Sequence, residues 1–330
     1  MRRARIVGVG HYVPPRVVTN HELEKYMETS DEWIQERTGI RERRWVDKDT
    51  ATSDLALEAT KNALKDANLQ PEDIEFIVFA TLSPDYFFPG SGVLLERKLG
   101  LKGIGALDVR TQCTGFIYGL AVADSMIRAG MYNRVLMVGA EVQSKGLDIS
   151  TRGRDVAVLF GDGAGAVILE ATEEDRGVLS THLHADGNHA ELLWTPAPGS
   201  AWERFASKEM LEDGRFFPKM EGREVFKHAV VRFLQVIQET LEANKIRPQD
   251  VKLLIPHQAN QRITEAVRER LGLPKERVAS NIDRYGNTTA ASIPIAMSEA
   301  KQAGVLEDGD IVVLSAFGSG FTWASATIRW

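Results

Sequence analysis

The sequence predicts an α/β protein that contains an internal repeat. Short, fully apolar runs alternate with longer amphipathic runs along the 330 residues, which is typical of strands buried between helices. Residues 63–78 (ALKDANLQPEDIEFIV) also resemble residues 240–255 (TLEANKIRPQDVKLLI) at a constant offset of 177. A second echo pairs Phe160-Gly161-Asp162-Gly163 with Phe317-Gly318-Ser319-Gly320. Two echoes in the same order indicate a duplication.

The duplication predicts two similar halves, at residues 1–172 and 173–330. One segment, 195–218, departs from the alternation. It is rich in Pro, Gly, Ser and charge, yet it also contains several aromatic residues. Because that aromatic content is high for a solvated linker, we interpret this segment as a partly ordered cap.

Composition and charge exclude several classes of protein. A hydrophobic share of 43% and a charged share of 26% are ordinary for a globular chain. The net charge of −6, without a basic stripe, argues against a nucleic-acid binder. No apolar run approaches the ~20 residues of a membrane span, and the short apolar stretch after the basic N-terminus argues against a secretory signal. A single cysteine fits the reducing cytoplasm.

The first part of the chain is predicted to contain a strand, two helices and a second strand, in that order. Residues 5–9 are apolar and predict a strand. Ser30 can cap a short helix that Gly39 ends, because Ser accepts a bond from the first turn and Gly tolerates a left-handed conformation. A longer amphipathic helix is expected from Ser53 to Asn68, and the fully apolar strand 76–80 follows it.

Cys113 is predicted to lie at a strand-to-helix turn. Residues 104–109 read as a strand, and small and apolar residues recur at helical spacing over 116–126, with Gly130 at the expected end. Free backbone N–H groups and the helix dipole at such a turn favour a thiolate, which is the nucleophilic form. We therefore expect Cys113 to be a reactive nucleophile; the alternative is a buried structural thiol.

Two polar residues of the second half are placed to meet Cys113. His257 follows the strand of the second repeat, at the carboxyl end where open α/β sheets bind ligands. Asn287 precedes the small-residue helix 290–303, an arrangement that mirrors the one around Cys113. We expect these three side chains to converge where the two halves face each other.

Five motifs resemble β-ketoacyl-acyl carrier protein synthase III, the family that initiates bacterial fatty acid synthesis. They lie at 38–44 (TGIRERR), 160–165 (FGDGAG), 256–260 (PHQAN), 285–288 (YGNT) and 317–323 (FGSGFTW). The resemblance implies the five-layered αβαβα thiolase fold, a cytoplasmic homodimer, and acyl-coenzyme A and malonyl-acyl carrier protein as substrates. It implies no metal and no tightly bound cofactor, only a coenzyme A thioester as substrate.

The same resemblance implies roles for particular residues. Cys113 matches the nucleophile, and His257 and Asn287 match the pair that promotes decarboxylation. Two neutral donors would stabilise the enolate that forms when a malonyl thioester loses carbon dioxide. The backbone N–H groups of Cys113 and Ser319 would form an oxyanion hole, where familiar members have Gly in place of Ser319.

Further residues match binding positions of the family. Those expected to contact coenzyme A are Thr29, Trp33, Arg37, Arg152, Gly222 and Asn260, with Trp33 and Arg152 enclosing the adenine. Phe88 matches a residue that limits the acyl pocket across the dimer. Lys227, Arg262 and Arg270 match the basic patch for the carrier protein, although Glu269 replaces a usual basic residue beside Arg270.

Several alternatives follow from the same residues. Degradative thiolases need a second cysteine, and elongating condensing enzymes use two histidines where this chain offers Asn287. A glutamate base like that of hydroxymethylglutaryl-coenzyme A synthase could not be placed. A specialised homologue that condenses or transfers acyl groups in secondary metabolism stays open, because Gln112-Cys113-Thr114 is more polar than the usual nucleophile context. A non-catalytic acyl or coenzyme A binding protein would not need all three candidate catalytic residues.

Overall fold

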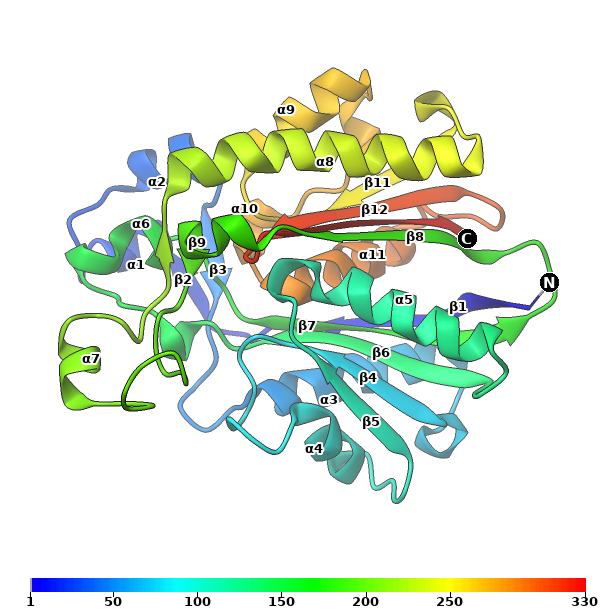
Figure 1. Ribbon diagram of the computed structural model, residues 1–330. Helices are drawn as coiled ribbons and strands as arrows, with labels where there is room; N and C mark the ends of the chain where they lie inside the picture. Colours follow the sequence, from blue (N-terminus) through cyan, green and yellow to red (C-terminus); the bar gives the residue numbers. More distant parts are fainter. Residues whose placement is uncertain (1) are drawn as a thin grey trace.

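The computed structural model describes residues 2–330 and has five layers, in the order helix, sheet, helix, sheet, helix (Figure 1). Helices α5 and α11 fill the middle layer between the two sheets, α3 and α4 cover the outer face of one sheet, and α8 and α9 cover the other. This architecture confirms the predicted thiolase-type α/β fold. No helix within residues 2–330 has the length and apolar character that crossing a membrane requires.

The first sheet has the strand order β1-β7-β6-β4-β5, with β1 and β7 antiparallel to their neighbours and β4, β5 and β6 parallel. Its strands are β1 (Arg3–Tyr12), β4 (Phe76–Ala80), β5 (Gly105–Val109), β6 (Arg134–Glu141) and β7 (Gly163–Thr172). Its helices are α3 (Thr52–Ala67), α4 (Ser91–Lys98) and α5 (Gly115–Arg128).

The second sheet has the order β11-β12-β13-β8. Its strands are β8 (Gly177–Ala185), β11 (Leu253–Pro256), β12 (Ile311–Gly318) and β13 (Thr322–Arg329). The helices around it are α8 (Gly222–Asn244), α9 (Gln261–Leu271), α10 (Ile282–Tyr285) and α11 (Ser292–Gln302).

Smaller elements lie at the end of the sheets where the sequence predicts the site (Figure 1). They comprise the ribbon β2 (Val17–Thr19) and β3 (Glu42–Arg44), the ribbon β9 (Leu193–Trp194) and β10 (Lys219–Met220), and the helices α1 (Asn20–Leu23), α2 (Asp31–Thr38), α6 (Arg154–Ala157) and α7 (Lys208–Glu212).

The offset of 177 seen in the sequence recurs in the backbone. Strand β12 lies 177 residues after β6 over its whole length, and α3 and α8 end at positions with the same spacing. Asn68 and Lys245, which follow those two helices, both adopt left-handed φ values of 54° and 56°. Because non-glycine residues seldom adopt this conformation, its recurrence at one offset supports the internal duplication independently of side-chain similarity.

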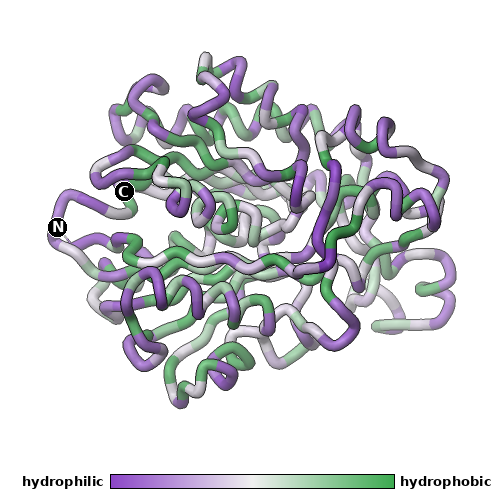
Figure 2. Tube along the Cα trace, turned by 180° about the vertical axis from the view of Figure 1, so that it is seen from behind, coloured by the Kyte–Doolittle hydropathy of each residue, from purple (hydrophilic) through white to green (hydrophobic). Residues whose placement is uncertain are grey.

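Most predicted elements form close to their predicted bounds. Strand 76–80 is found as predicted, and Ser30 accepts a hydrogen bond from the Trp33 N–H at the start of α2. Gly39 ends that helix with φ 79°, as its position predicted. The buried apolar residues form separate clusters between and outside the sheets. Figure 2 shows long hydrophobic stretches in the interior of the trace and hydrophilic stretches at its periphery.

The cap segment is held by its own polar contacts. The Ala197 N–H donates to the Arg215 carbonyl at 2.9 Å, and the Trp202 indole donates to the Pro196 carbonyl at 2.8 Å. The Arg215 guanidinium lies 4.8 Å from the centre of the Trp202 ring. These contacts close the segment on itself and around the short helix α7.

Candidate active site

Cys113 lies in a single 3₁₀ turn, Gln112–Thr114, between β5 and α5. Gln112 adopts φ 48°, a left-handed conformation that costs a non-glycine residue about 1–2 kcal/mol. Thr289, 177 residues later, has φ 49° at the corresponding turn before α11. The fold therefore places Cys113 at a sharp turn in one half and Ala290 at the equivalent turn in the other, which leaves one nucleophile for both halves.

Burial favours the thiol form of the Cys113 side chain, against the thiolate that its place at the turn was expected to favour. Burial raises the pKa of Cys113 to about 12, and the nearby Glu141 carboxylate acts in the same direction. The backbone N–H groups of Ser319 and Cys113 act in the opposite direction, as the helix-end argument predicted. Their effect is smaller than that of burial, which the sequence could not weigh because exposure is a tertiary property.

The two predicted oxyanion donors lie close to the sulfur. The backbone N–H groups of Ser319 and Cys113 both lower the pKa of the Cys113 side chain, against the effect of burial. The Ser319 hydroxyl instead donates to the Leu193 carbonyl, so the side chain is directed away from the sulfur. This arrangement gives a physical reason why Ser can stand where familiar members of the resembled family have Gly.

His257 follows β11 and is 1% exposed. Burial lowers the pKa of His257 to about 3, so the imidazole is neutral at physiological pH. Its Nδ1 lies 2.7 Å from the Ser292 hydroxyl, which fixes the ring, while the buried Nε2 has no hydrogen-bond partner within residues 2–330. Nε2 is therefore available to a substrate. Ser292 is a residue that the sequence reasoning missed.

Asn287 is oriented by backbone contacts on both sides. Its N–H donates to the Leu159 carbonyl at 2.8 Å, and its Oδ1 accepts from the Thr289 N–H at 2.8 Å. Because Oδ1 is occupied in this way, the amide NH₂ is the group left to act toward a ligand.

One cavity of about 830 Å³ contains all three candidate catalytic residues in its lining. The structure therefore brings Cys113, His257 and Asn287 together, as the repeat predicted. Five cationic side chains also line it: Arg37, Arg154, Arg223, Lys227 and Arg262. Asp155 is the acidic residue of the lining. An elongated anionic ligand fits such a cavity better than a neutral one. No cluster of three or more His, Cys, Asp or Glu suited to a metal ion occurs in residues 2–330.

The residues predicted to bind coenzyme A, the acyl chain or the carrier protein divide into two groups. Those in the cavity lining are Trp33, Arg37, Gly222, Lys227, Asn260 and Arg262. Those outside it are Thr29, Phe88, Arg152 and Arg270. Arg270 is exposed in the last turn of α9, and Phe88 is 80% exposed on the loop before α4.

Arg154, rather than Arg152, lies over Trp33. The Arg154 guanidinium is 4.8 Å from the centre of the Trp33 ring, and the Arg37 guanidinium is 4.5 Å away. Arg152 instead pairs with Asp148 at 2.5 Å and donates to the Glu212 carbonyl at 2.9 Å. Arg152 thus holds the cap and lines a separate cavity of about 260 Å³. The two arginines are two residues apart: Arg152 lies in the 3₁₀ turn Thr151–Gly153, and Arg154 is the first residue of α6.

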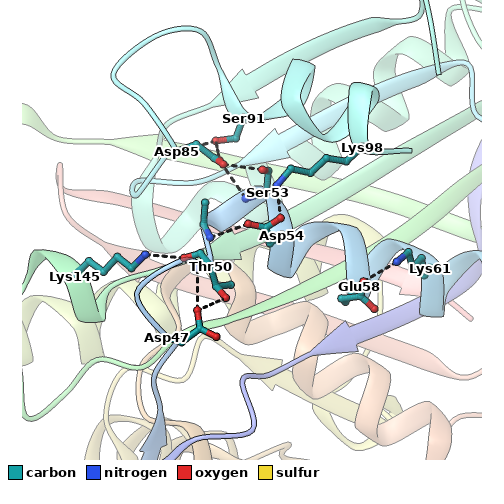
Figure 3. A network of polar contacts seen from close by, with 11 residues as sticks. Asp47, Thr50, Ser53, Asp54, Glu58, Lys61, Asp85, Ser91, Lys98 and Lys145 are labelled. Carbon is teal, nitrogen blue, oxygen red and sulfur yellow. Dashed lines mark hydrogen bonds and ion pairs between the residues drawn. The ribbon is translucent and has the colours of Figure 1, made fainter. Parts of the chain in front are cut away.

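The loop that carries Phe88 is anchored by a polar network (Figure 3). Asp85 accepts bonds from the Ser53 hydroxyl at 2.7 Å and the Ser91 hydroxyl at 2.8 Å, which ties the loop to α3 and α4. The fully buried Glu141 accepts from Ser83 at the beginning of the same loop. The loop is therefore fixed at its base, although Phe88 itself is exposed.

Comparisons with known proteins agree over the whole chain. A family profile described as 3-oxoacyl-[acyl-carrier-protein (ACP)] synthase III matches residues 107–187, and a profile for the C-terminal part of that enzyme matches residues 241–330. The β-ketoacyl-[acyl-carrier-protein] synthase III of Caldanaerobacter subterraneus subsp. tengcongensis is 48% identical over 327 residues, which cover 99% of this chain and 98% of the relative. The same enzyme of Xanthomonas campestris pv. campestris is 47% identical over the same coverage.

Solved structures give the same result. The crystal structure of 3-oxoacyl-[acyl-carrier-protein] synthase III from Aquifex aeolicus has a TM-score of 0.91 and 43% identity, and the match covers 99% of this chain and 100% of that one. A priming β-ketosynthase from a polyketide pathway has a TM-score of 0.90 but only 29% identity, over 98% of this chain and 96% of that one. Similarity in sequence therefore favours the synthase III relatives, although both structures share the fold.

Proposed function

Because the chain belongs to the β-ketoacyl-acyl carrier protein synthase III family, we propose that it catalyses the initiating condensation of type II fatty acid synthesis. The observation that carries this proposal is the meeting of Cys113, His257 and Asn287 in one cavity lined by cations. The reaction has two stages. An acyl group first passes from acyl-coenzyme A to Cys113, and malonyl-acyl carrier protein then accepts it with loss of carbon dioxide.

In the first stage the Cys113 sulfur attacks the thioester carbonyl. The N–H groups of Cys113 and Ser319 stabilise the oxyanion of the tetrahedral intermediate. When that intermediate collapses, the bond to the coenzyme A sulfur breaks and the proton of the Cys113 thiol ends on the departing thiol. The exchange of one thioester for another therefore neither consumes nor releases a proton, which is consistent with a Cys113 side chain that begins as a thiol. The acyl-enzyme predicts ping-pong kinetics.

In the second stage the malonyl thioester loses carbon dioxide, and negative charge develops on its carbonyl oxygen. Nε2 of His257 and the Asn287 amide donate to that oxygen. For Nε2 to carry the ring proton, the Ser292 hydroxyl must turn its hydrogen from the Thr289 carbonyl, at 3.0 Å, to Nδ1 of His257, at 2.7 Å. The resulting carbanion attacks the acyl-Cys113 carbonyl. Cleavage of the C–S bond releases the β-ketoacyl product and a Cys113 thiolate, which takes up one proton from solvent.

Coenzyme A enters through the cationic side of the cavity. Trp33 offers a flat surface for adenine, and we assign Arg154 the stacking role that the resemblance gave to Arg152. The Arg154 guanidinium, 4.8 Å from the ring centre, would move outward to admit the adenine. Arg37 is suited to a phosphate, and Gly222 and Asn260 border the path of the pantetheine arm. Thr29 lies outside the cavity lining, so its role in this path stays a prediction from the resemblance.

The carrier protein is proposed to dock on the same side. Arg262 is exposed at the start of α9 and lines the cavity, whereas Lys227 is paired with Glu224 at 2.7 Å. Arg270 lies at the far end of α9, beside the exposed Glu269. We therefore expect Arg262 to contribute more than Lys227 or Arg270 to binding an acidic partner.

We also propose that the enzyme works as a cytoplasmic homodimer. Strand β5 lies at the edge of the first sheet and is half-exposed, unlike its fully buried neighbour β4 (Figure 1). An edge strand of this kind can pair with its copy in a second chain. The exposed Phe88 would then be covered by the partner, where it could limit the length of the acyl pocket.

Intact-protein mass spectrometry tests this function. The protein is incubated with acyl-coenzyme A thioesters of graded chain length, and malonyl-acyl carrier protein is then added. We expect a short acyl group such as acetyl to label wild type and not Cys113→Ser, and the label to leave as a β-ketoacyl-acyl carrier protein. Labelling by long or unusual acyl groups alone, or discharge to another acceptor, would instead indicate a specialised homologue of secondary metabolism.

A further inference from the structure

Arg43 is a buried cation that the proposed mechanism does not use. Its residue is 0% exposed, and no carboxylate within residues 2–330 lies at ion-pair distance from its guanidinium. Burial lowers the pKa of Arg43 to about 10, yet the group stays charged at physiological pH. A buried charge without a paired carboxylate is costly, so its hydrogen bonds must account for its presence.

Those hydrogen bonds connect the β2–β3 ribbon to a distant segment of the active site. Nη1 donates to the Asn20 Oδ1 at 2.7 Å, and Nη2 donates to the Val158 carbonyl at 2.7 Å. Val158 also lines the active-site cavity. Because the guanidinium is planar, these bonds fix the Val158 carbonyl relative to the ribbon.

The segment that follows Val158 holds the backbone of Asn287. The Asn287 N–H donates to the Leu159 carbonyl at 2.8 Å, and the Gly161 N–H donates to the Asn287 carbonyl at 3.1 Å. Phe160 and Asn287 therefore form an isolated parallel bridge. A shift of this segment would move Asn287 with it.

The stem of Arg43 packs against both sides of this bridge. A Cβ atom added at Gly161 would lie 3.1 Å from the Arg43 Cβ, and one added at Gly286 would lie 3.4 Å from it. Gly286 also has φ 64°, which disfavours other residues. The Arg43 side chain therefore leaves little room for a Cβ atom beside the backbone immediately before Asn287 or in the segment that holds it.

We infer that Arg43 is a positioning residue for decarboxylation, because it fixes the Val158–Gly161 segment and through it the Asn287 carboxamide. The inference rests on the proposed role of Asn287. It does not extend to Cys113, which lies on a different element, the turn between β5 and α5. The two stages of the reaction should therefore respond differently to a change at Arg43.

The test compares Arg43→Met and Arg43→Lys with the matched control Arg41→Met, a change at an exposed arginine of the same motif. Acylation of Cys113 is followed by intact mass, and decarboxylation by carbon dioxide release from malonyl-acyl carrier protein. We expect decarboxylation to fall on the order of 100-fold in Arg43→Met while acylation stays within about threefold, because a small misplacement of a catalytic group is costly. Arg43→Lys keeps one donor and the charge, and should fall less.

A double variant connects the effect to Asn287. If Arg43 acts through that residue, Arg43→Met combined with Asn287→Ala should decarboxylate no more slowly than Asn287→Ala alone. Equal loss of both stages in the Arg43 variants, no loss, or full additivity in the double variant would overturn the inference. If Arg43→Met does not fold, Arg43→Lys and its double variant give the same comparison. If Asn287→Ala itself decarboxylates normally, the proposed role of Asn287 is wrong, and the proposed function fails. If Asn287→Ala is impaired but Arg43→Met is not, only the inference about Arg43 fails.

Discussion

Gly318 lies directly against Cys113, so that a Cβ atom at position 318 would be 2.7 Å from the Cys113 sulfur and 2.5 Å from its Cβ. The end of β12 in the second half thus contacts the nucleophile of the first half. Gly318→Ala should reduce acylation of Cys113 on the order of 100-fold, because the sulfur must shift away from the Ser319 N–H.

The effect of that substitution is measured as the rate of acetyl transfer to Cys113 by intact mass spectrometry. Gly146→Ala is the matched control, since a Cβ at Gly146 meets nothing within 4 Å. Overpacking should also cost Gly318→Ala about 1–3 kcal/mol of stability. Acylation at the wild-type rate in a folded Gly318→Ala protein would contradict this geometry.

The buried thiol predicts an unusual pH dependence of alkylation. Because the pKa of Cys113 is raised to about 12, its rate with iodoacetamide should increase roughly tenfold per pH unit between about pH 7 and pH 10, without a plateau. Cys113→Ser is the blank, since the chain has no other cysteine. A plateau near neutral pH would show instead that the free enzyme holds a thiolate.

His257 should destabilise the fold in acid. Its pKa is lowered from 6.5 to about 3, so the unfolded chain binds the proton more readily. The stability that this difference contributes is fully present above pH 6.5 and is lost as the pH falls toward about 3. Urea unfolding should show wild type losing about 2 kcal/mol more than His257→Gln between pH 6.5 and about pH 5. Parallel pH curves would contradict a buried neutral imidazole.

That comparison also removes the contribution of Glu141. Burial raises the pKa of Glu141 to about 7, so this carboxyl stabilises the fold at low pH and loses its contribution as the pH rises through that value. Since both proteins contain Glu141, its opposite effect cancels in the difference.

Replacing Arg154 should weaken the binding of acyl-coenzyme A, whereas replacing Arg152 should not. Arg154→Ala should raise the KM for acyl-coenzyme A about fivefold, the expected loss for one cation–π or stacking contact, because Arg154 lies over Trp33. Arg152→Ala, which removes a contact to the cap, should leave this KM unchanged. A larger rise in this KM for Arg152→Ala than for Arg154→Ala would instead support the assignment that the resemblance gave to Arg152.

The meeting of Cys113, His257 and Asn287 in one cavity could be predicted from the sequence because the repeat carries positional information. An offset of 177 places Ala290 opposite Cys113, so Asn287 had to lie near the equivalent turn, and apolar periodicity located the strand before His257. Local signals such as Ser30 and Gly39 were also sufficient, since capping depends on neighbouring residues only.

Properties that depend on tertiary structure could not be predicted from the sequence in this way. The protonation of Cys113 depends on burial, which no local pattern reports. The choice between Arg152 and Arg154 depends on contacts with Trp33 and with the cap, which are distant in the sequence. Ser292 and Arg43 contact residues far away in the chain, and each looks like an ordinary helix or strand residue by itself.

The most direct test of the two-stage account is the fate of acyl-Cys113 in His257→Ala and Asn287→Ala. Each variant is acetylated by acetyl-coenzyme A, freed of excess substrate and mixed with malonyl-acyl carrier protein, while intact mass is followed over time. The account predicts that both variants acquire the acetyl group at close to the wild-type rate and then keep it, because decarboxylation is blocked. Equal loss of acetylation and discharge, or normal discharge in both variants, would contradict the division of roles between Cys113 and the His257–Asn287 pair.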